Sequence, residues 1–334
     1  MADRHELTAQ GVAPAMAPAM APTVLVPGGA GFVGRHAVLA LLGRGCRVIV
    51  GSREPSRVDL RLPAAARACE RRALRFETLL TPDAWDEALA GIDVVLNCVG
   101  ILRQRGRETY ERVHHLAPAA LAVACRARDI RLIHVSALGL DAPARSGFLR
   151  SKQSGEAALR RSGADWQIVR PSLLDGDGGY GALWLRRLAR WPVHPVPADA
   201  GGRIAVLDVR DLGEALARLS RAPSAAEGGR RGREFDLGGP DLRTLAGHLA
   251  ALRATGKPRP AWRLPIPSLL ARCVSHVCDL LHATPFSFGH WELLRRDNCP
   301  ARNRTAELLG RAPRRIGCDG VGLPPPLPAV ARGP

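Results

Sequence analysis

Short apolar runs alternate with amphipathic segments along the first half of the chain. The apolar runs that predict strands lie at residues 23–26, 46–50, 73–80, 93–100, 131–136 and 166–171. Segments with the spacing and end signals of helices stand between them, at 35–42, 82–89, 108–128 and 151–161. Apolar strands that alternate with helices predict a parallel, doubly wound α/β sheet with both faces covered. Ligands of such sheets bind beyond the carboxyl ends of the strands.

A glycine-rich turn follows the first apolar run directly. Gly28, Gly31 and Gly34 have the spacing that brings a pyrophosphate onto a helix N-terminus, with Phe32 and Val33 in the same turn. The first glycine lets the backbone turn sharply, the second leaves room for the phosphates, and the third lets the helix pack close to the strand. The alternative is a tight turn that binds nothing. Strand, turn, helix and second strand in this order predict a Rossmann-type dinucleotide site.

The end of the second strand indicates which dinucleotide binds. Sites that prefer NAD place Asp or Glu about twenty residues after the glycines, to hold the ribose 2′-hydroxyl. Ser52 and Arg53 stand there in this chain, and a guanidinium offers a fixed fork of donors to phosphate oxygens. Glu54 comes one residue late for the acidic role and keeps NAD(H) open. We therefore predict NADP(H) as the favoured cofactor and NAD(H) as the alternative.

The pattern becomes irregular after residue 175. Residues 175–181 are rich in glycine and predict a flexible loop, while 204–207 and 235–237 indicate short strands. Apolar positions recur at helical spacing over 266–281, which predicts either a helix packed on the core or a docking face for a partner or a membrane surface. We expect four parts. Residues 1–22 form a disordered extension and 23–175 a Rossmann domain. Residues 176–310 form a smaller C-terminal substrate or docking lobe, with segments that return to the Rossmann core, and 311–334 form a disordered tail.

The chain is strongly basic, and composition limits its partners. Nearly all of the net charge of +17 comes from arginine, because Lys152 and Lys257 are the only lysines. The basic residues are scattered, aromatics make up 4%, and no nucleic-acid motif is present, so we expect no nucleic-acid partner. A basic face against acidic lipid or an acidic subunit stays open. The eight cysteines form no C-x-x-C pair and no ligand spacing, which predicts no metal site and reduced cysteines in a cytoplasmic protein; peripheral association with an inner membrane stays open.

Six short motifs, in order over roughly residues 23–300, resemble those of an atypical or extended short-chain dehydrogenase/reductase. They are Gly-Phe-Val-Gly-Arg-His at 31–36, Asn-Cys-Val-Gly-Ile-Leu at 97–102, His-Val-Ser-Ala-Leu-Gly at 134–139, Leu-Arg-Ser-Lys at 149–152, Val-Arg-Pro-Ser at 169–172 and Leu-Gly-Gly-Pro at 237–240. The finer pattern is similar to the branch that contains the NADPH-binding accessory subunit of respiratory complex I and its bacterial relatives, which are NAD-dependent epimerase/dehydratase-like. At strand ends of such a fold, Asn97, Gly100 and Pro171 are expected near the cofactor.

The resemblance also implies a catalytic triad, of which this chain keeps two members. In active relatives a Tyr four residues before the Lys is the general acid, the Lys lowers the pKa of the Tyr and holds the nicotinamide ribose, and the Ser orients the carbonyl or alcohol. Ser136 and Lys152 stand at the Ser and Lys positions, but Phe148 stands where the Tyr is expected. A phenyl ring has no proton to give, and general acid–base catalysis contributes about 10²–10⁴-fold. We therefore expect little or no turnover.

Four further residues bear on the site. His114 and His115 lie in the predicted helix 108–128, where one of them could face the site; the alternative is a surface or core histidine. Tyr180, in the glycine-rich segment, could supply a hydroxyl from another direction. The resemblance leads us to expect an Asp at position 79, near the adenine. Leu79 stands there instead, which weakens that contact.

Three functions follow from these residues. The leading hypothesis is an NAD(P)H-binding protein with little or no turnover and a structural or assembly role near respiratory complex I. The alternative is an active NADP-dependent reductase or nucleoside-sugar epimerase/dehydratase-like enzyme with a different proton donor. The third is a scaffold or redox sensor at a membrane, in contact through residues 266–281. Whether the chain is an enzyme stays open at this point.

Overall fold

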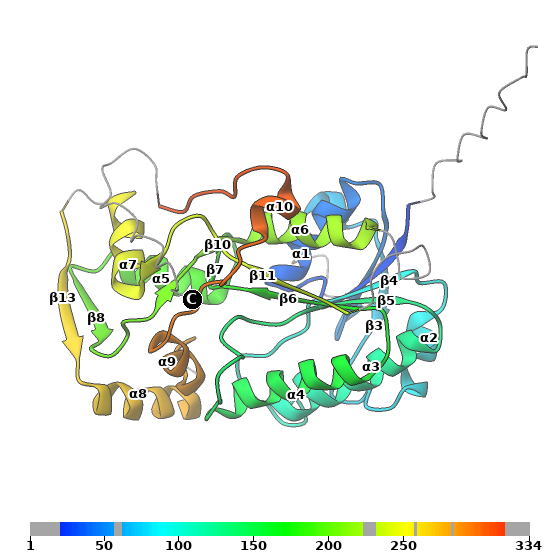
Figure 1. The fold of residues 1–334 in the computed structure, drawn as a ribbon, viewed down its shortest axis with the longest axis horizontal. Coiled ribbons are helices and arrows are strands. Elements are labelled where there is room, and N and C mark those ends of the chain that lie inside the picture. Colours follow the sequence, from blue (N-terminus) through cyan, green and yellow to red (C-terminus); the bar gives the residue numbers. More distant parts are fainter. Residues whose placement is uncertain (1–20, 57–61, 223–231, 257–258, 282–283, 318–334) are drawn as a thin grey trace, which may run out of the picture.

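The computed structural model describes residues 21–56, 62–222, 232–256, 259–281 and 284–317. Within these ranges a seven-stranded sheet forms the centre, and every neighbouring pair of its strands is parallel (Figure 1). The strand order is β11-β6-β5-β4-β1-β2-β3. The strands are β1 (Thr23–Pro27), β2 (Arg47–Ser52), β3 (Glu70–Ala73), β4 (Val94–Asn97), β5 (Arg131–Val135), β6 (Trp166–Pro171) and β11 (Arg233–Leu237).

Helices cover both faces of this sheet. Along β1, Val24 and Val26 belong to the core on one face and Leu25 to the core on the other, because side chains alternate along a strand. In Figure 1, α1, α6 and α10 lie above the sheet and α2, α3 and α4 below it. Their bounds are α1 (Phe32–Leu42), α6 (Val209–Arg221), α10 (Thr305–Leu309), α2 (Asp86–Leu89), α3 (Ala117–Arg126) and α4 (Gly147–Arg161). The Rossmann-type α/β class predicted from the sequence is confirmed.

A second group of elements lies to one side of the sheet, at the left of Figure 1. Its core contains Leu188, Val196 and Leu249, which join α5, β8 and α7. The group consists of α5 (Tyr180–Ala189), α7 (Leu245–Ala254), α8 (Ser268–Leu281), α9 (Phe288–Leu294) and the parallel pair β8 (Val193–Pro197) and β13 (Trp262–Ile266). Two short pairs connect it to the sheet: β7 (Leu174–Asp175) with β10 (Leu207–Asp208), and β9 (Arg203–Ile204) with β12 (Arg243–Thr244).

Two predicted elements differ from the structure. The third strand lies at 70–73 rather than 73–80, because an edge strand needs little apolar sequence, while the apolar run after it buries Leu74 and Phe76 without strand pairing. The predicted helix 108–128 is divided: residues Glu111–Leu116 form a π-helix, and α3 follows. Pro118 lies in the first turn of α3, where its missing N–H is not needed, so the widened turn comes just before the proline.

Further differences lie in the C-terminal half. Residues 175–181 are not one loop, because α5 begins at Tyr180. Residues 311–317, expected in a disordered tail, pack on α6, where Arg311 and Arg314 bind the fully buried Asp211. The rest of the predicted tail (318–334) and residues 1–20 of the predicted extension lie outside the described residues. Segments of the C-terminal half lie on the sheet: β11 is its edge strand, and α6 packs against α1 and the strands.

Among the described residues, no helix combines the length and the apolar composition that crossing a membrane would require.

Close packing of α4 on the π-helix leads to a prediction about Gly155. A methyl group there would fall on the carbonyl oxygen of His114, so Gly155→Ala should destabilise the fold by about 1–3 kcal/mol. Gly181→Ala in α5 is the control, because a methyl group there meets no atom of the described residues within 4 Å. Guanidinium denaturation midpoints measure both. Equal stability of the two variants would contradict the close contact.

Candidate functional site

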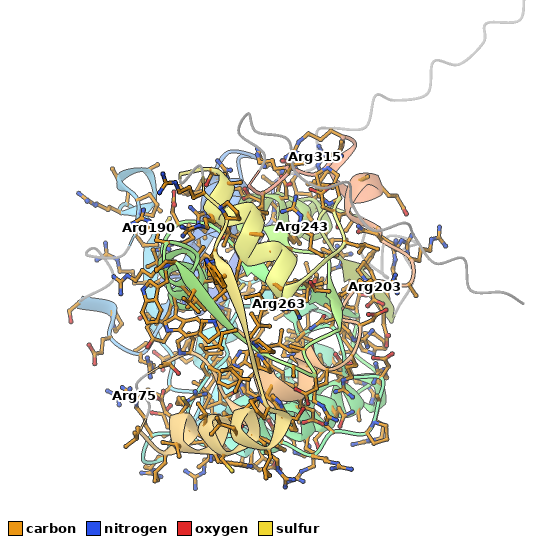
Figure 2. All side chains as sticks on the ribbon, turned by 90° about the vertical axis from the view of Figure 1, so that its left-hand side faces the viewer. Arg75, Arg190, Arg203, Arg243, Arg263 and Arg315 are labelled. Atoms are coloured by element: carbon orange, nitrogen blue, oxygen red, sulfur yellow. The ribbon has the colours of Figure 1, made fainter. Side chains whose placement is uncertain are left out.

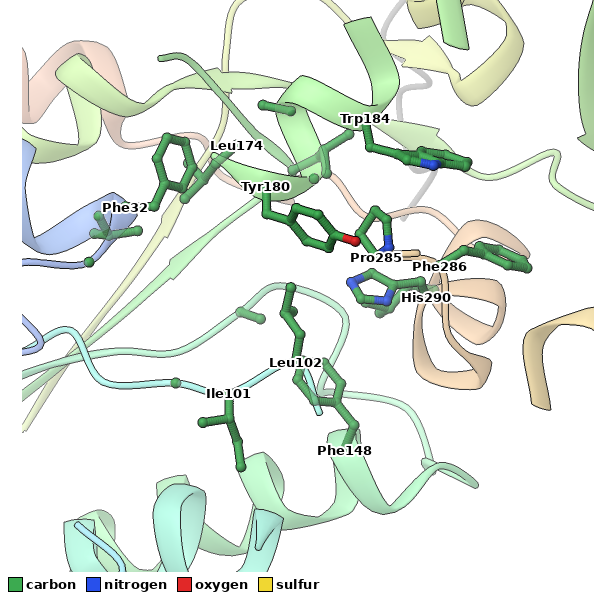
Figure 3. Close-up of a pocket in the computed structure, with 18 of the residues that line it drawn as sticks. Phe32, Ile101, Leu102, Phe148, Leu174, Tyr180, Trp184, Pro285, Phe286 and His290 are labelled. Carbon is green, nitrogen blue, oxygen red and sulfur yellow. The ribbon is translucent and has the colours of Figure 1, made fainter. Parts of the chain in front are cut away.

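A cavity of about 970 Å³ opens at the carboxyl ends of the strands and continues between α5, α8 and α9 (Figure 3). Most of the site residues predicted from the sequence line this cavity: Gly28, Gly31, Phe32, Val33, Ser52, Arg53, Glu54, Gly100, Ser136, Phe148, Lys152, Pro171, His114 and Tyr180. Gly34, Asn97, His115 and Leu79 are not among its lining residues. The structure therefore brings most of the expected site residues to one place.

The glycine turn forms one end of the cavity. Gly28 has φ +75°, which side chains rarely adopt, and its carbonyl oxygen accepts the Gly31 N–H at 2.8 Å. A methyl group on Gly34 would collide with that same oxygen, so the glycine is needed for α1 to start this close. Among the described residues no side chain caps the start of α1. Its first amides lack helical partners, and the turn therefore fits a dinucleotide pyrophosphate.

Arg53 forms an ion pair with Glu108 at the end of β2. Both side chains line the cavity, at the position where the adenosine ribose lies in folds of this type. The Oγ of Ser52 accepts the N–H of Glu54 at 3.3 Å. Glu108 was missed from the sequence, because it is 55 residues from Arg53 and belongs to no motif. The Glu108 carboxylate thus binds the Arg53 guanidinium, which the sequence predicted to bind a 2′-phosphate.

Phe148 and Lys152 lie one turn apart on α4, at the middle of the cavity. The Nζ atom of Lys152 lies 5.7 Å from the centroid of the Phe148 ring. Burial lowers the pKa of Lys152 to about 8, against the opposing effect of Glu156. Ser136 follows β5 and is buried beside the same carboxylate. The ammonium therefore exchanges its proton much closer to neutral pH than an exposed lysine does.

The Glu156 carboxylate is held one turn after Lys152 on α4. Its two oxygens accept from Nε and Nη2 of Arg170 at 2.8 and 2.6 Å, and one of them also accepts from Arg160 at 2.9 Å. Burial acts to raise the pKa of Glu156, but the bonds and charge of Arg170, together with Ser136 and Arg160, outweigh it and keep the pKa below its usual value. A permanent negative charge thus lies close to the ammonium and limits how far the pKa of Lys152 falls.

His114 is the histidine that faces the cavity, and its protonation state is fixed. Its Nε2 accepts the N–H of Ile101 at 3.1 Å, so Nδ1 carries the proton and donates to Ser151 Oγ at 3.1 Å. Ser151 in turn donates to the carbonyl oxygen of Phe148 at 2.9 Å. Burial, with the charge of Lys152, holds the pKa of His114 well below its usual value. Neutral His114 therefore connects α4 to the loop after β4. His115 pairs with Glu111 and does not line the cavity.

Asn97 acts behind the cavity wall. Its Oδ1 accepts the N–H of Val99 at 3.0 Å, so its Nδ2 faces and donates to Nδ1 of His134, also at 3.0 Å. Burial lowers the pKa of His134 to about 4, and the nearby Lys152 adds to this effect. The Asn97–His134 hydrogen bond joins the ends of β4 and β5, and the loop that contains Gly100 follows β4 directly. A methyl group on Gly100 would meet only the His114 ring, at 3.9 Å, so the space beside this backbone is cavity.

The far half of the cavity is apolar. Tyr180 begins α5, and its hydroxyl points toward Pro285 and His290 in Figure 3. Burial lowers the pKa of His290 to about 4, so this ring is neutral at pH 7. The remaining wall comes from separate segments without a shared motif, which is why sequence reasoning missed it: Trp184, Leu185, Leu188, Ile266, Val274, Phe286, Leu293 and Leu294.

The adenine end differs from what the resemblance implied. Leu79 packs against the core below the sheet rather than in the cavity. Leu74 and Phe76, which follow β3, line the cavity near Ser52 instead. An adenine ring would therefore meet apolar side chains here.

Comparisons with known proteins agree with this geometry. Residues 28–186 match the model of the NAD(P)H-binding family. The chain is 33% identical over 205 residues to a ceramide reductase of Caulobacter vibrioides, across 60% of this chain and 61% of that protein. It is 24% identical over 220 residues to the mitochondrial NADH dehydrogenase 1 alpha subcomplex subunit 9 of Arabidopsis thaliana, across 65% of this chain and 54% of that protein. The chain thus spans less than two thirds of the length of these curated relatives.

Solved structures share the fold. An NADPH-dependent quinone oxidoreductase from Escherichia coli, complexed with NADPH, superposes with a TM-score of 0.66 at 16% identity, across 87% of this chain and 96% of that one. The UDP-N-acetylglucosamine 4-epimerase from Bacillus cereus gives a TM-score of 0.60 at 14% identity, across 89% and 93%. The resemblance to complex I subunits that the motifs suggested is therefore confirmed, the fold is shared with epimerases, and residues 28–186 match an NAD(P)H-binding family model.

The lowered pKa of Lys152 predicts a stability effect. An unfolded lysine keeps its proton up to about pH 10.4, whereas the pKa of Lys152 in the fold is about 8, so protonation below pH 8 weakens the folded state. Lys152→Met should therefore raise the free energy of unfolding at pH 7 by about 1–3 kcal/mol. Wild type should recover this difference between pH 8 and 10.5, where only the unfolded chain binds the proton.

Urea denaturation at pH 7 and pH 10 measures this effect. Arg150→Met, at an exposed position of the same helix, is the control and should show no such pH dependence. A Lys152→Met variant that is less stable than wild type at both pH values would contradict the lowered pKa of Lys152.

Proposed function

We propose that this chain is an NAD(P)H-dependent reductase of a bulky, apolar carbonyl compound of lipid size. The observation that carries the proposal is the cavity: its near end fits a dinucleotide, and its far end is walled by Trp184, Phe286, Leu293 and similar side chains. Apolar walls with a few convergent polar groups are typical of sites for apolar small molecules. The name of one relative, ceramide reductase, supports the same class of substrate.

The chain's own residues divide the work of binding. The turn at Gly28 and Gly31 would hold the pyrophosphate, Ser52 and Arg53 the adenosine ribose, and Pro171 would border the nicotinamide half. A bound dinucleotide supplies a hydride to the carbonyl carbon. Ser136 would donate a hydrogen bond that orients the carbonyl oxygen. The apolar far end would bury the substrate chain and exclude water from the reacting group.

The carbonyl oxygen needs a proton as its carbon receives the hydride, and Phe148 has none to give. Lys152 is the group that we assign to this step. Its pKa of about 8 lies close to neutral pH, which is favourable for a general acid. Transfer of one ammonium proton to the oxygen completes the alcohol and leaves a neutral amine, and the amine then takes a proton from solvent. Lys152 would thus replace the phenol rather than assist it.

This assignment predicts the activity of two variants. Lys152→Met should lower kcat on a long-chain ketone by about 10²–10⁴-fold. Wild-type kcat should fall as the pH rises through about 8, because the ammonium loses its proton. Tyr180→Phe is the control: its hydroxyl lies in the same cavity, and its removal should change kcat little. NADPH binding, followed by the melting temperature, is measured for each variant separately. Loss of turnover in Tyr180→Phe, with Lys152→Met active, would overturn the assignment.

The ion pair of Arg53 bears on the choice between NADPH and NADH, and we propose that NADPH is preferred. The 2′-phosphate would displace Glu108 from the guanidinium, because phosphate oxygens form the same forked bonds with a higher charge. Glu108→Gln should therefore tighten NADPH binding severalfold and leave NADH unchanged. Arg53→Ala should weaken NADPH alone. Calorimetric titration of both nucleotides measures this, and parallel changes for the two nucleotides would reject the role of Arg53.

A second candidate function is favoured by Phe148 and by the complex I relatives. Here the chain binds NAD(P)H with little or no turnover and acts as a structural or assembly protein. Phe148→Tyr separates the two candidates. If wild type oxidises no NADPH with any ketone and Phe148→Tyr is active, the site binds its ligands but lacks a proton donor, which supports the second candidate. Turnover by wild type that needs Lys152 would exclude this second candidate.

A further inference from the structure

One side of the molecule exposes large apolar side chains around β8, β13 and α8. The most exposed are Trp262 (81%), Leu269 (74%) and Leu280 (81%). Others on the same elements are Leu264, Leu270, Val274, Val277, Leu281 and Val193. Figure 2 views the molecule from this side, with β13 in front and α8 below. An exposed apolar surface of this size requires an explanation in a folded protein.

The exposed face of the β8–β13 pair continues the wall of the cavity. Trp262, Leu264 and Ile266 alternate along β13 and so share one side of it. Ile266 pairs in register with Pro197, and Leu264 with Pro195. Ile266, Pro195 and Pro197 line the cavity, whereas Leu264 and Trp262 are exposed. The apolar wall therefore runs from the cavity out onto the surface without interruption.

Helix α8 has its apolar side turned outward. Among its residues only Ala271 and Ser275 are buried, and both lie on the side opposite Leu269 and Leu280. Leu270 and Val274 line the cavity and are also largely exposed, so the cavity opens along this helix. The sequence left two interpretations of residues 266–281, and the exposed side chains favour a docking face over a helix packed on the core.

The same face is rich in arginine and poor in acid: its one acidic residue in the described α8 is Asp279, near the end of the helix, and it pairs with Arg103. Segments 178–198 and 242–278, which form α5, β8, α7, β13 and most of α8, contain no Asp or Glu. Exposed arginines lie along them; Arg190 and Arg263 are labelled on this side in Figure 2. Further exposed arginines of these segments are Arg187, Arg259 and Arg272. The charge of this face is complementary to a uniformly anionic surface.

We propose that this face docks on an anionic lipid bilayer, with α8 and the Trp262 edge in the interface. Tryptophan and leucine side chains next to arginines are typical of interfacial segments, where apolar groups enter the acyl region and guanidinium groups meet phosphates. The lipid substrate then passes from the bilayer into the cavity beside Leu270 and Val274. This last step rests on the proposed reductase function, whereas the docking itself does not.

Vesicle flotation of the full-length protein tests the proposal. Wild type is mixed with vesicles of phosphatidylcholine alone or of phosphatidylcholine with phosphatidylglycerol. The test variant is Leu269→Gln/Val277→Gln/Leu280→Gln, whose three positions are exposed and lie outside the cavity lining. The control is Leu116→Gln/Val123→Gln, at exposed apolar positions of the π-helix and α3 on another side of the molecule. Melting temperatures with NADPH verify that each variant is folded.

We expect wild type and the control to float with anionic vesicles, less so at high salt, and the test variant to bind at least tenfold more weakly. Equal flotation of test variant and wild type, or no binding by wild type, would overturn the proposal. So would a wild-type oligomer that the test variant dissociates, because the face would then be covered by a second copy.

Reduction of a short, water-soluble ketone by the same proteins separates this proposal from the proposed function. Vesicle binding without any turnover would reject the reductase and leave the docking supported. Turnover of the soluble ketone without vesicle binding would reject the docking alone.

Discussion

The ammonium of Lys152 beside the Phe148 ring is the interaction on which the chemistry of this site depends. A phenyl ring carries neither a proton nor a full negative charge, and burial lowers the pKa of Lys152 to about 8 against the opposing charge of Glu156. Glu156 limits that fall, and its own charge is secured by Arg170. Loss of the phenol therefore does more than remove a proton donor. It leaves a lysine whose own proton is available.

Two histidines near this lysine are held in place by hydrogen bonds. His114 and His134 lie close enough for the charge of Lys152 to lower the pKa of each, and both are held neutral by defined hydrogen bonds. The π-helix widens the backbone so that the His114 ring reaches both the Ile101 amide and Ser151. Widened turns of this kind are frequent at functional sites. Here the turn connects the loop after β4 to the helix that carries Lys152.

The sequence predicts the parts of this molecule that local patterns encode. Strand and helix periodicity identified the parallel sheet, and the glycine spacing identified the turn at Gly28, because each depends on neighbours within one segment. The Arg53–Glu108 pair and the apolar half of the cavity could not be predicted, since they join segments far apart in the chain. The strand β3 was misplaced for the opposite reason: an apolar run near Phe76 fills the core without pairing as a strand.

The net charge of +17 has a different meaning once the fold is known. Arginine is abundant throughout the chain, and the many ion pairs, such as those of Asp211 and Glu156, show that much of it serves internal structure. What distinguishes one side is the absence of acid from segments 178–198 and 242–278, where the exposed apolar side chains also gather. An arginine-rich composition explains basic residues over the whole surface. It does not explain why Asp and Glu are absent from segments 178–198 and 242–278. A basic surface that is poor in acids and lies next to an open apolar cavity is better explained by contact with an anionic, apolar phase than by composition.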